Sequence, residues 1–265
     1  MRKTKIICTI GPASESEAVF TQMCKAGLNV ARLNFSHGNH EEHLKRIRMI
    51  RKVREELKLP IPIMLDTKGP EYRIGVFKDH RVTLADGQDF TFTTEDIEGD
   101  ESRVSVSYKG FAKDLRKGDR VLVNNGLVVC TVKKINGNDV LCRVDIGGEL
   151  SDRKSMNFPG RLMSNAFLSE QDKRDLLFGI EQDVDYVAAS FMSTKEDALE
   201  MRNFLDENGG QDIDIIAKIE NRSGVDNVEA ISEVVDGIMV ARGDLGVEIP
   251  FVEVPAIQKQ IVSKC

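Results

Sequence analysis

Two charged side chains follow a short apolar run near the C-terminal end of the chain. Lys218 and Glu220 come after the apolar residues 215–217 and stand two residues apart. Such a run predicts a buried parallel strand, on which residues two apart point to the same face. A buried ammonium and carboxylate are costly unless something pairs with them. The pair is therefore either a structural ion pair or a site where Glu220 holds a metal and Lys218 meets an anionic oxygen.

A second carboxylate favours the metal interpretation. The largely apolar residues 236–241 predict another strand, followed by Arg-Gly-Asp-Leu-Gly at residues 242–246. Adjacent parallel strands would bring Glu220 and Asp244 to the same edge of a sheet. Two carboxylates without a soft ligand are typical of a hard divalent cation such as Mg²⁺. Gly243 and Gly246 would let backbone N–H groups approach an anion closely.

The composition limits the classes of partner. The 265 residues contain 37 basic and 43 acidic side chains, a net charge of −6, which argues against nucleic acid as the main partner. The five cysteines are scattered, show no C-x-x-C spacing and indicate reduced thiols in a cytoplasmic protein. No run approaches 18 apolar residues, so we expect no membrane-spanning helix.

Strands and helices alternate on both sides of a different central region. We expect strands at residues 5–10, 29–36 and 61–66, and again at 184–191, 215–220 and 236–241, with helices between them. Three oxygen- or nitrogen-bearing side chains, Arg32, Asn34 and Ser36, share one face of the second strand. Asp66 and Thr67 end the third strand. Polar residues at the C-terminal ends of the strands are typical of a (β/α)8 barrel, a TIM-type α/β fold. A doubly wound sheet is the alternative, because six strands are too few to close an eight-stranded barrel.

The pattern of the central region, residues 70–165, predicts an inserted β domain. Short alternating runs are separated by turn signals such as Asp86-Gly87, Asn125-Gly126 and Asn136-Gly137. This pattern predicts a small antiparallel all-β barrel or sandwich. We therefore expect a first part of the barrel domain at residues 1–69, an inserted β lid at 70–165, and a second, incomplete part of the barrel domain at 166–265.

Five motifs in order resemble the pyruvate kinase family over essentially the whole chain. They are CTIGPAS at residues 8–14, ARLNFSHG at 31–38, LDTKGPE at 65–71, AKIEN at 217–221 and VARGDLG at 240–246. Each motif alone is moderately specific, and the five in register are highly specific. The resemblance implies transfer of a phosphoryl group from phosphoenolpyruvate to ADP, which gives pyruvate and ATP in glycolysis.

The resemblance also implies roles for individual residues. Glu220 and Asp244 would hold Mg²⁺ or Mn²⁺. Lys218 would stabilise charge on the moving phosphoryl group, and Arg32 would bind the phosphate, so these two are the expected catalytic residues. The K⁺ ligands would be Asn34, Ser36, Asp66 and Thr67. The backbone around Ala241, Gly243 and Asp244 would take the substrate carboxylate. Arg73 and Lys154 would reach the nucleotide when the inserted domain closes as a lid.

Some features depart from the family pattern. Asn124 and Asn125 stand where the family usually has two acidic residues, and this removes two charges near the nucleotide. The chain also stops after six expected strands, before the last barrel strands and the C-terminal domain. We expect a fragment of a longer protein, or edges closed by association, and a homo-oligomer (a homotetramer at full length). On its own, the 265-residue chain is expected to be weakly active or inactive.

Other interpretations remain open. Another phosphoenolpyruvate/pyruvate barrel enzyme, an aldolase or mutase, would keep Glu220 and Asp244 but would not need the K⁺ ligands or the lid. A truncated chain could bind Mg²⁺ and phosphoenolpyruvate without turnover. His37, His40 and His43 suggest zinc, but we interpret them as a solvated helix N-terminus, because no cysteine lies near. The acidic residues 95–101 predict a solvated loop, with Ca²⁺ binding as the alternative.

Overall fold

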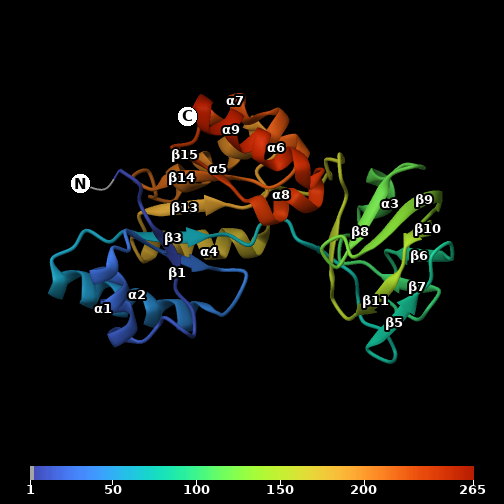
Figure 1. Ribbon diagram of the computed structural model, residues 1–265, viewed down its shortest axis with the longest axis horizontal. Helices are drawn as coiled ribbons and strands as arrows, with labels where there is room; N and C mark the ends of the chain where they lie inside the picture. Colours follow the sequence, from blue (N-terminus) through green and yellow to red (C-terminus); the bar gives the residue numbers. More distant parts are fainter. Residues whose placement is uncertain (1–2) are drawn as a thin grey trace.

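Six parallel strands form one sheet whose spatial order follows the order along the chain (Figure 1). The computed structural model describes residues 3–265. The strands are β1 (Ile7–Thr9), β2 (Val30–Asn34), β3 (Ile63–Asp66), β13 (Tyr186–Ala189), β14 (Asp214–Ile219) and β15 (Gly237–Val240). A doubly wound sheet would reverse its strand order at a switch point. The order therefore excludes that alternative and confirms a barrel-type α/β fold with six of the eight strands.

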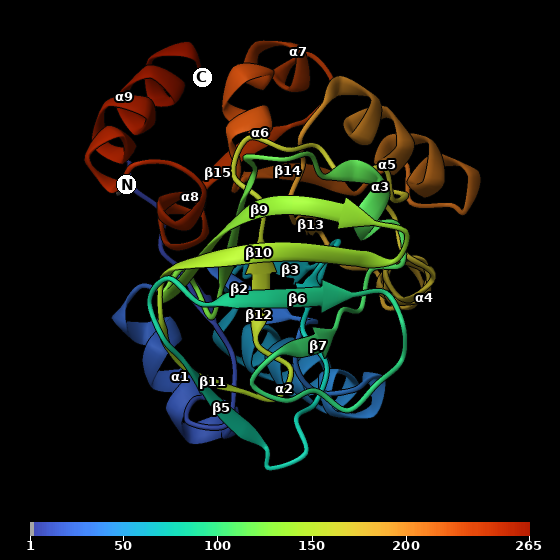
Figure 2. The same ribbon diagram turned by 90° about the vertical axis from the view of Figure 1, so that its right-hand side faces the viewer.

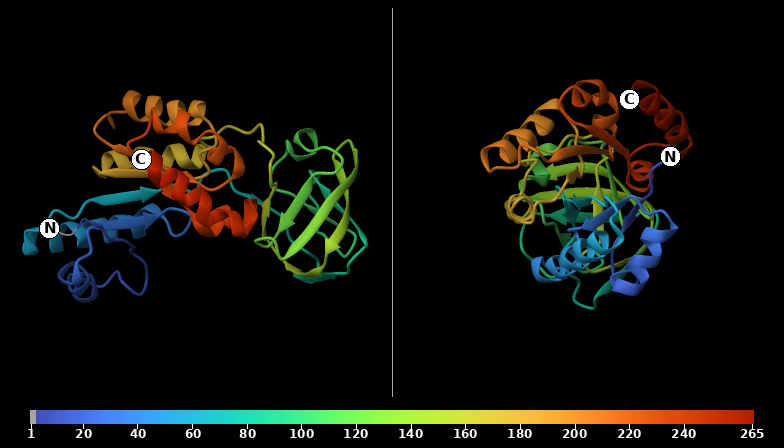
Figure 3. Two further views of the ribbon diagram at one scale, coloured as in Figure 1. Left: turned by 45° about the horizontal axis from the view of Figure 1, so that its top comes forward. Right: turned by 90° about the vertical axis from the view of Figure 1, so that its left-hand side faces the viewer.

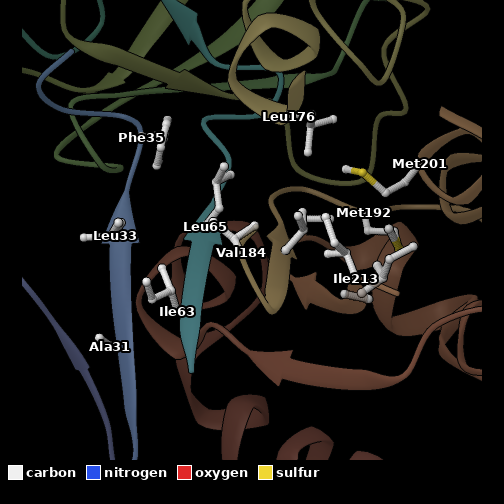
Figure 4. Close-up of a cluster of buried hydrophobic side chains, with 14 of the residues drawn as sticks. Ala31, Leu33, Phe35, Ile63, Leu65, Leu176, Val184, Met192, Met201 and Ile213 are labelled. Carbon is white, nitrogen blue, oxygen red and sulfur yellow. The ribbon is translucent and has the colours of Figure 1, made fainter. Parts of the chain in front are cut away.

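Helices cover the outer side of this curved sheet (Figure 3). They are α1 (Glu17–Ala26), α2 (His40–Leu57), α4 (Glu170–Glu181), α5 (Lys195–Glu207), α6 (Arg222–Asp226), α7 (Val228–Ser232), α8 (Arg242–Glu248) and α9 (Val254–Lys264), with a 3-10 turn at Phe251–Glu253. Figure 4 shows why they pack there: Leu33 and Leu65 of the strands and Leu176 and Met201 of the helices belong to one buried apolar cluster. Burial of this cluster fixes the strand ends that carry the polar residues.

The chain between β3 and α4 builds a second unit with its own apolar core (Figure 2). Its seven-stranded sheet has the order β4-β12-β8-β9-β10-β6-β7, and β5 and β11 form a separate pair. The elements are β4 (Tyr72–Arg73), β5 (Arg81–Leu84), β6 (Asp89–Thr93), β7 (Arg103–Ser105), α3 (Phe111–Asp114), β8 (Arg120–Val123), β9 (Val128–Asn136), β10 (Asp139–Ile146), β11 (Gly148–Ser151) and β12 (Ser155–Asn157).

One detail of the inserted unit differs from the expected antiparallel pattern. Strands β6 and β7 pair in parallel, whereas the other pairs in this sheet are antiparallel. The segment 94–102 makes this possible because it returns the chain to the start of β6 before β7 begins; the backbone N–H of Thr91 donates to the carbonyl of Ser102 at 2.9 Å. A hairpin turn, which the short spacing alone suggests, would have reversed the direction.

The inserted unit lies beyond the carboxyl ends of the six parallel strands (Figure 1). These ends carry the polar residues singled out in the sequence. The arrangement therefore brings a set of charged strand ends to face a separate β unit, which is the usual position of the site in a barrel of this type.

Candidate active site

Lys218 is the centre of a buried ionic cluster. Its Nζ lies 3.1 Å from Oε1 of Glu220 and 2.9 Å from Oδ1 of Asp66. Asp66 and Glu220 are each 1% exposed, and Lys218 is 8% exposed. Burial opposes the charge of the ammonium group, but the carboxylates of Glu220 and Asp66 outweigh it and raise the pKa of Lys218. Lys218 therefore carries a fixed positive charge at the carboxyl end of β14.

Glu220 is held close to a second carboxylate. Its Oε2 accepts the backbone N–H of Phe191 at 2.7 Å. Burial raises the pKa of Glu220 to about 7, and the nearby charge of Asp244 adds to the rise, while Lys218 and the Phe191 N–H oppose it. Asp244 itself is exposed in the first turn of α8. The structure thus brings together Glu220 and Asp244, the two carboxylates predicted from the sequence to bind a divalent cation.

The chemistry of this donor set fits Mg²⁺. A divalent cation between Glu220 and Asp244 would offset the repulsion that helps to raise the pKa of Glu220. Within residues 3–265 there is no cluster of three or more His, Cys, Asp or Glu side chains suited to a metal. The protein therefore offers two carboxylates, and Mg²⁺ commonly takes its remaining ligands from water and substrate phosphate.

Arg32 reaches the same cluster from β2. Its Nε donates to Oδ2 of Asp66 at 2.5 Å, and its Nη1 donates to Oγ1 of Thr9 at 2.5 Å. The Arg32 side chain keeps 25% of its surface exposed. Because a guanidinium has five N–H donors, this anchoring leaves donors for an incoming anion.

The four side chains expected to bind K⁺ lie at the ends of β2 and β3. Asn34 and Asp66 are direct neighbours in the parallel register. Oδ1 of Asn34 accepts the backbone N–H of Ser36 at 3.0 Å, and Oγ1 of Thr67 accepts that of Ser190 at 3.1 Å. These oxygens suit a hard cation. A cation there would have to share the carboxylate of Asp66 with Arg32 and Lys218.

The segment expected to bind a carboxylate leads into α8. A side chain added at Gly243 would meet no atom within 4 Å among residues 3–265, so the Gly243 backbone is open to a ligand. By contrast, the N–H of Ala241 is directed at the carbonyl of Ile219 at 3.4 Å. The open backbone is therefore at Gly243 and Asp244 rather than at Ala241.

The two residues expected to bind nucleotide lie together in the inserted unit. Arg73 is on β4, and Lys154 immediately precedes β12, which pairs with β4. Nη1 of Arg73 donates to the carbonyl of Arg153 at 2.7 Å, and Arg73 also pairs with Glu71. The carbonyl of Lys154 accepts the N–H of Ile74 at 2.9 Å. These contacts are internal to the inserted unit.

The sequence reasoning missed Ser190 and Phe191, which follow β13. Oγ of Ser190 accepts from Nζ of Lys218 at 2.6 Å and donates to the carbonyl of Thr67 at 2.7 Å. Phe191 has φ +58°, a left-handed conformation that is rare for a bulky residue, and this directs its N–H at Glu220. Their position directly after a central parallel strand was the signal that could have found them.

The interpretation of the histidines as a solvated helix N-terminus was wrong for His43. This side chain is 2% exposed, and its ring stacks on Phe35 with centroids 4.0 Å apart. Its Nε2 lies 2.9 Å from the carbonyl of His37. His40 is half-exposed and lies 2.6 Å from Oδ1 of Asp175. His43 faces inward because it is on the side of α2 that packs against the sheet.

The acidic residues 95–101 are engaged in local contacts. Asp96 pairs with Lys109 at 2.5 Å, and Glu95 pairs with Arg103 at 3.2 Å. Asp100 accepts from the hydroxyl of Ser102 at 2.6 Å. These partners account for the segment as a structured surface loop.

The chain is similar to known proteins over its whole length. A family model described as pyruvate kinase, barrel domain, matches residues 1–265. Proteins named pyruvate kinase from Clostridium acetobutylicum and Clostridium perfringens are 49% and 47% identical over 266 residues; all of this chain is covered, and 56% of each relative. The Bacillus licheniformis protein of the same name is 48% identical over 267 residues, with 46% of its length covered. The chain spans about half the length of the curated relatives it matches.

Proposed function

This chain belongs to the pyruvate kinase family, and from that premise we propose that it carries the phosphoenolpyruvate and metal site of an enzyme that transfers a phosphoryl group to ADP. One observation carries the proposal. Lys218 is a buried ammonium between Asp66 and Glu220 at the carboxyl ends of the parallel strands, and Asp244 lies near enough to Glu220 to raise its pKa. This combination of a fixed cation and a two-carboxylate metal site is what phosphoryl transfer requires.

The catalytic roles follow from charge. Phosphoryl transfer spreads negative charge over the equatorial oxygens of the moving group, and fixed cations stabilise it without reorganisation. In this proposal Lys218 faces the moving phosphoryl group, and Arg32 uses its remaining donors to hold the phosphate. Mg²⁺ or Mn²⁺ at Glu220 and Asp244 would act as a Lewis acid toward substrate oxygens. The backbone of Gly243 and Asp244, next to Ala241, would take the substrate carboxylate.

The remaining roles complete the site. K⁺ would bind to oxygens of Asn34, Ser36, Asp66 and Thr67. Arg73 and Lys154 would contact the nucleotide phosphates when the inserted unit, residues 70–165, closes over the barrel residues 1–69 and 166–265 and excludes water. We also propose a cytoplasmic homo-oligomer, a tetramer in the full-length protein, in keeping with its five free thiols. Among the residues that the structure describes, no helix has the length and apolarity to cross a membrane.

A coupled assay tests this function. The full-length protein is given phosphoenolpyruvate, ADP, Mg²⁺ and K⁺, and pyruvate is measured by its reduction to lactate. We expect turnover that needs ADP and is stimulated by K⁺, and that is lost in Glu220→Gln. Turnover of phosphoenolpyruvate that depends on neither ADP nor K⁺ would contradict the proposal and favour an aldolase or mutase. The same assay on the 265-residue chain shows whether this part alone turns over phosphoenolpyruvate.

A further inference from the structure

Helix α8 carries two acidic residues that face the same pocket. Asp244 and Glu248 are four residues apart, one helical turn, so they lie on one side of α8. Both line a pocket of about 180 Å³ between the barrel part and the inserted unit. Asn157 and Phe158, in the strand and loop that lead back out of the inserted unit, line the same pocket. Figure 1 shows α8 at the end of the barrel part that faces the inserted unit.

Glu248 faces the inserted unit directly. Burial raises the pKa of its carboxylate, and the nearby side chain of Asn157 and backbone N–H of Phe158, which line the same pocket, oppose that rise. The turn of the inserted unit at Gly126 also reaches α8: an atom added at its Cβ position would lie 3.8 Å from Cγ1 of Val247. Thus one turn of α8 lies beside two separate segments of the inserted unit.

The connecting segments are themselves linked near this point. The hydroxyl of Tyr72, at the start of the inserted unit, donates to Oδ1 of Asn165, near its end, at 2.5 Å. Both residues line the pocket that contains Glu248. The two connections can therefore move as one hinge, and a hinge alone does not fix the angle of the inserted unit. A further contact between the two parts, such as the one at Glu248, is needed for that.

We propose that Glu248 is a positioning residue that sets the orientation of the inserted unit and couples it to the metal site. Glu248 holds Asn157 and Phe158, and α8 transmits any displacement over one turn to Asp244. The second half rests on the proposed function, in which Asp244 is a metal ligand. By linkage, a metal held at Asp244 must then bias the orientation of the inserted unit, and the orientation must bias metal affinity by the same factor.

Distances between spin labels test the orientation. Labels on cysteines introduced at exposed Lys134 of the inserted unit and exposed Arg48 of the barrel part report their separation, with Cys8 and Cys265 replaced by serine in the full-length protein. We expect a narrow distance distribution in the parent protein. Glu248→Ala and Asn157→Ala should each broaden or shift it, because each removes one side of the same contact. Glu207→Ala, at an exposed position on α5, is the matched control and should leave it unchanged.

The outcomes distinguish the two parts of the proposal, the orienting role of Glu248 and its coupling to the metal site. If Glu248→Ala does not fold, Asn157→Ala decides, since Asn157 is on the other side of the contact. Mn²⁺ binding, read by electron paramagnetic resonance of the free ion, should weaken by about fivefold in both variants, the lower end of usual coupling between sites. Unchanged distances in both variants overturn the proposal. Changed distances with unchanged Mn²⁺ affinity overturn the coupling. If the parent protein binds no Mn²⁺, the proposed metal site is wrong. The spin-label distances then still test whether Glu248 sets the orientation of the inserted unit.

Discussion

Lys218 of β14 reaches across β13 to Asp66 of β3, with Nζ and Oδ1 2.9 Å apart although the residues are separated by 152 positions in the chain. Ser190, directly after β13, bridges them: its hydroxyl oxygen lies 2.6 Å from Nζ of Lys218 and 3.3 Å from Oδ1 of Asp66. Three neighbouring strands therefore share one polar network. Because β3 lies before the inserted unit and β13 after it, this network also joins the two parts of the barrel.

Replacing Lys218 by methionine should damage both stability and catalysis. The change leaves Asp66 and Glu220 buried without their shared cation, and removing one partner of a buried ion pair costs about 3–5 kcal/mol. Thermal unfolding of the ligand-free protein measures this cost. In the coupled assay, loss of a fixed charge at the reacting group should lower kcat by about a hundredfold or more. Lys195→Met is the control, because its exposed pair with Glu233 should contribute less than about 1 kcal/mol.

Ser190→Ala should cost less than the lysine change but more than a surface serine. It removes the acceptor for Lys218 and leaves the carbonyl of Thr67 without its buried donor. Such unsatisfied groups cost about 1–3 kcal/mol. Ser102→Ala removes one solvent-exposed hydrogen bond to Asp100 and should cost less, about 0.5–1 kcal/mol. Equal unfolding midpoints for the two variants would show that the bridge contributes nothing to stability.

Much of this network could be predicted from the sequence, because strand ends in a parallel sheet meet at one edge. That rule brought Lys218, Glu220 and Asp244 together without knowledge of distances. It did not identify Ser190 or Phe191, because the strand was expected to continue to residue 191, whereas β13 ends at Ala189. The side-chain pairing of Arg32 with Asp66 was also hidden, because it depends on the register of β2 and β3.

Helix α8 was the element that sequence patterns described least well. Residues 242–248 include Gly243 and Gly246, and glycine costs about 1 kcal/mol relative to alanine in a helix interior. No helix was predicted for these residues. In the structure Leu245 is fully buried, and its N–H donates to the carbonyl of Ala241 at 2.9 Å. Tertiary packing of Leu245 overrides the weak local propensity, and packing of that kind is not visible in a local pattern.

Gly69→Ala should test how tightly the end of β3 packs against the segment after β13. Gly69 has φ +68°, and a Cβ there would lie 2.8 Å from Cβ of Ser190. Gly87 has φ +82° with no atom within 4 Å of such a Cβ among the described residues. Gly87→Ala should therefore cost only the backbone strain, about 1–2 kcal/mol. Gly69→Ala should cost about 1–3 kcal/mol more, from overpacking. Equal losses in urea unfolding would mean that the backbone shifts freely to admit the methyl group.

The raised pKa of Glu220 predicts that the metal-free protein loses stability as pH rises. Burial holds this pKa at about 7 in the folded state, whereas the ordinary value is 4.5. Between these values the folded protein binds a proton that the unfolded chain does not, so the free energy of unfolding falls with increasing pH. The full loss, reached above pH 7, is about 3 kcal/mol.

Glu220→Gln should remove this pH dependence, because glutamine does not titrate. With the metal chelated, the variant's unfolding free energy minus that of the parent should rise between pH 5 and pH 8. Below about pH 4 the difference should be nearly constant, since Glu220 is then protonated in both the folded and the unfolded parent. Adding Mn²⁺ at pH 8 should stabilise the parent and not the variant. A difference that stays flat across this range would show that Glu220 is ionised throughout, and that the Lys218 ammonium outweighs burial and the repulsion from Asp244.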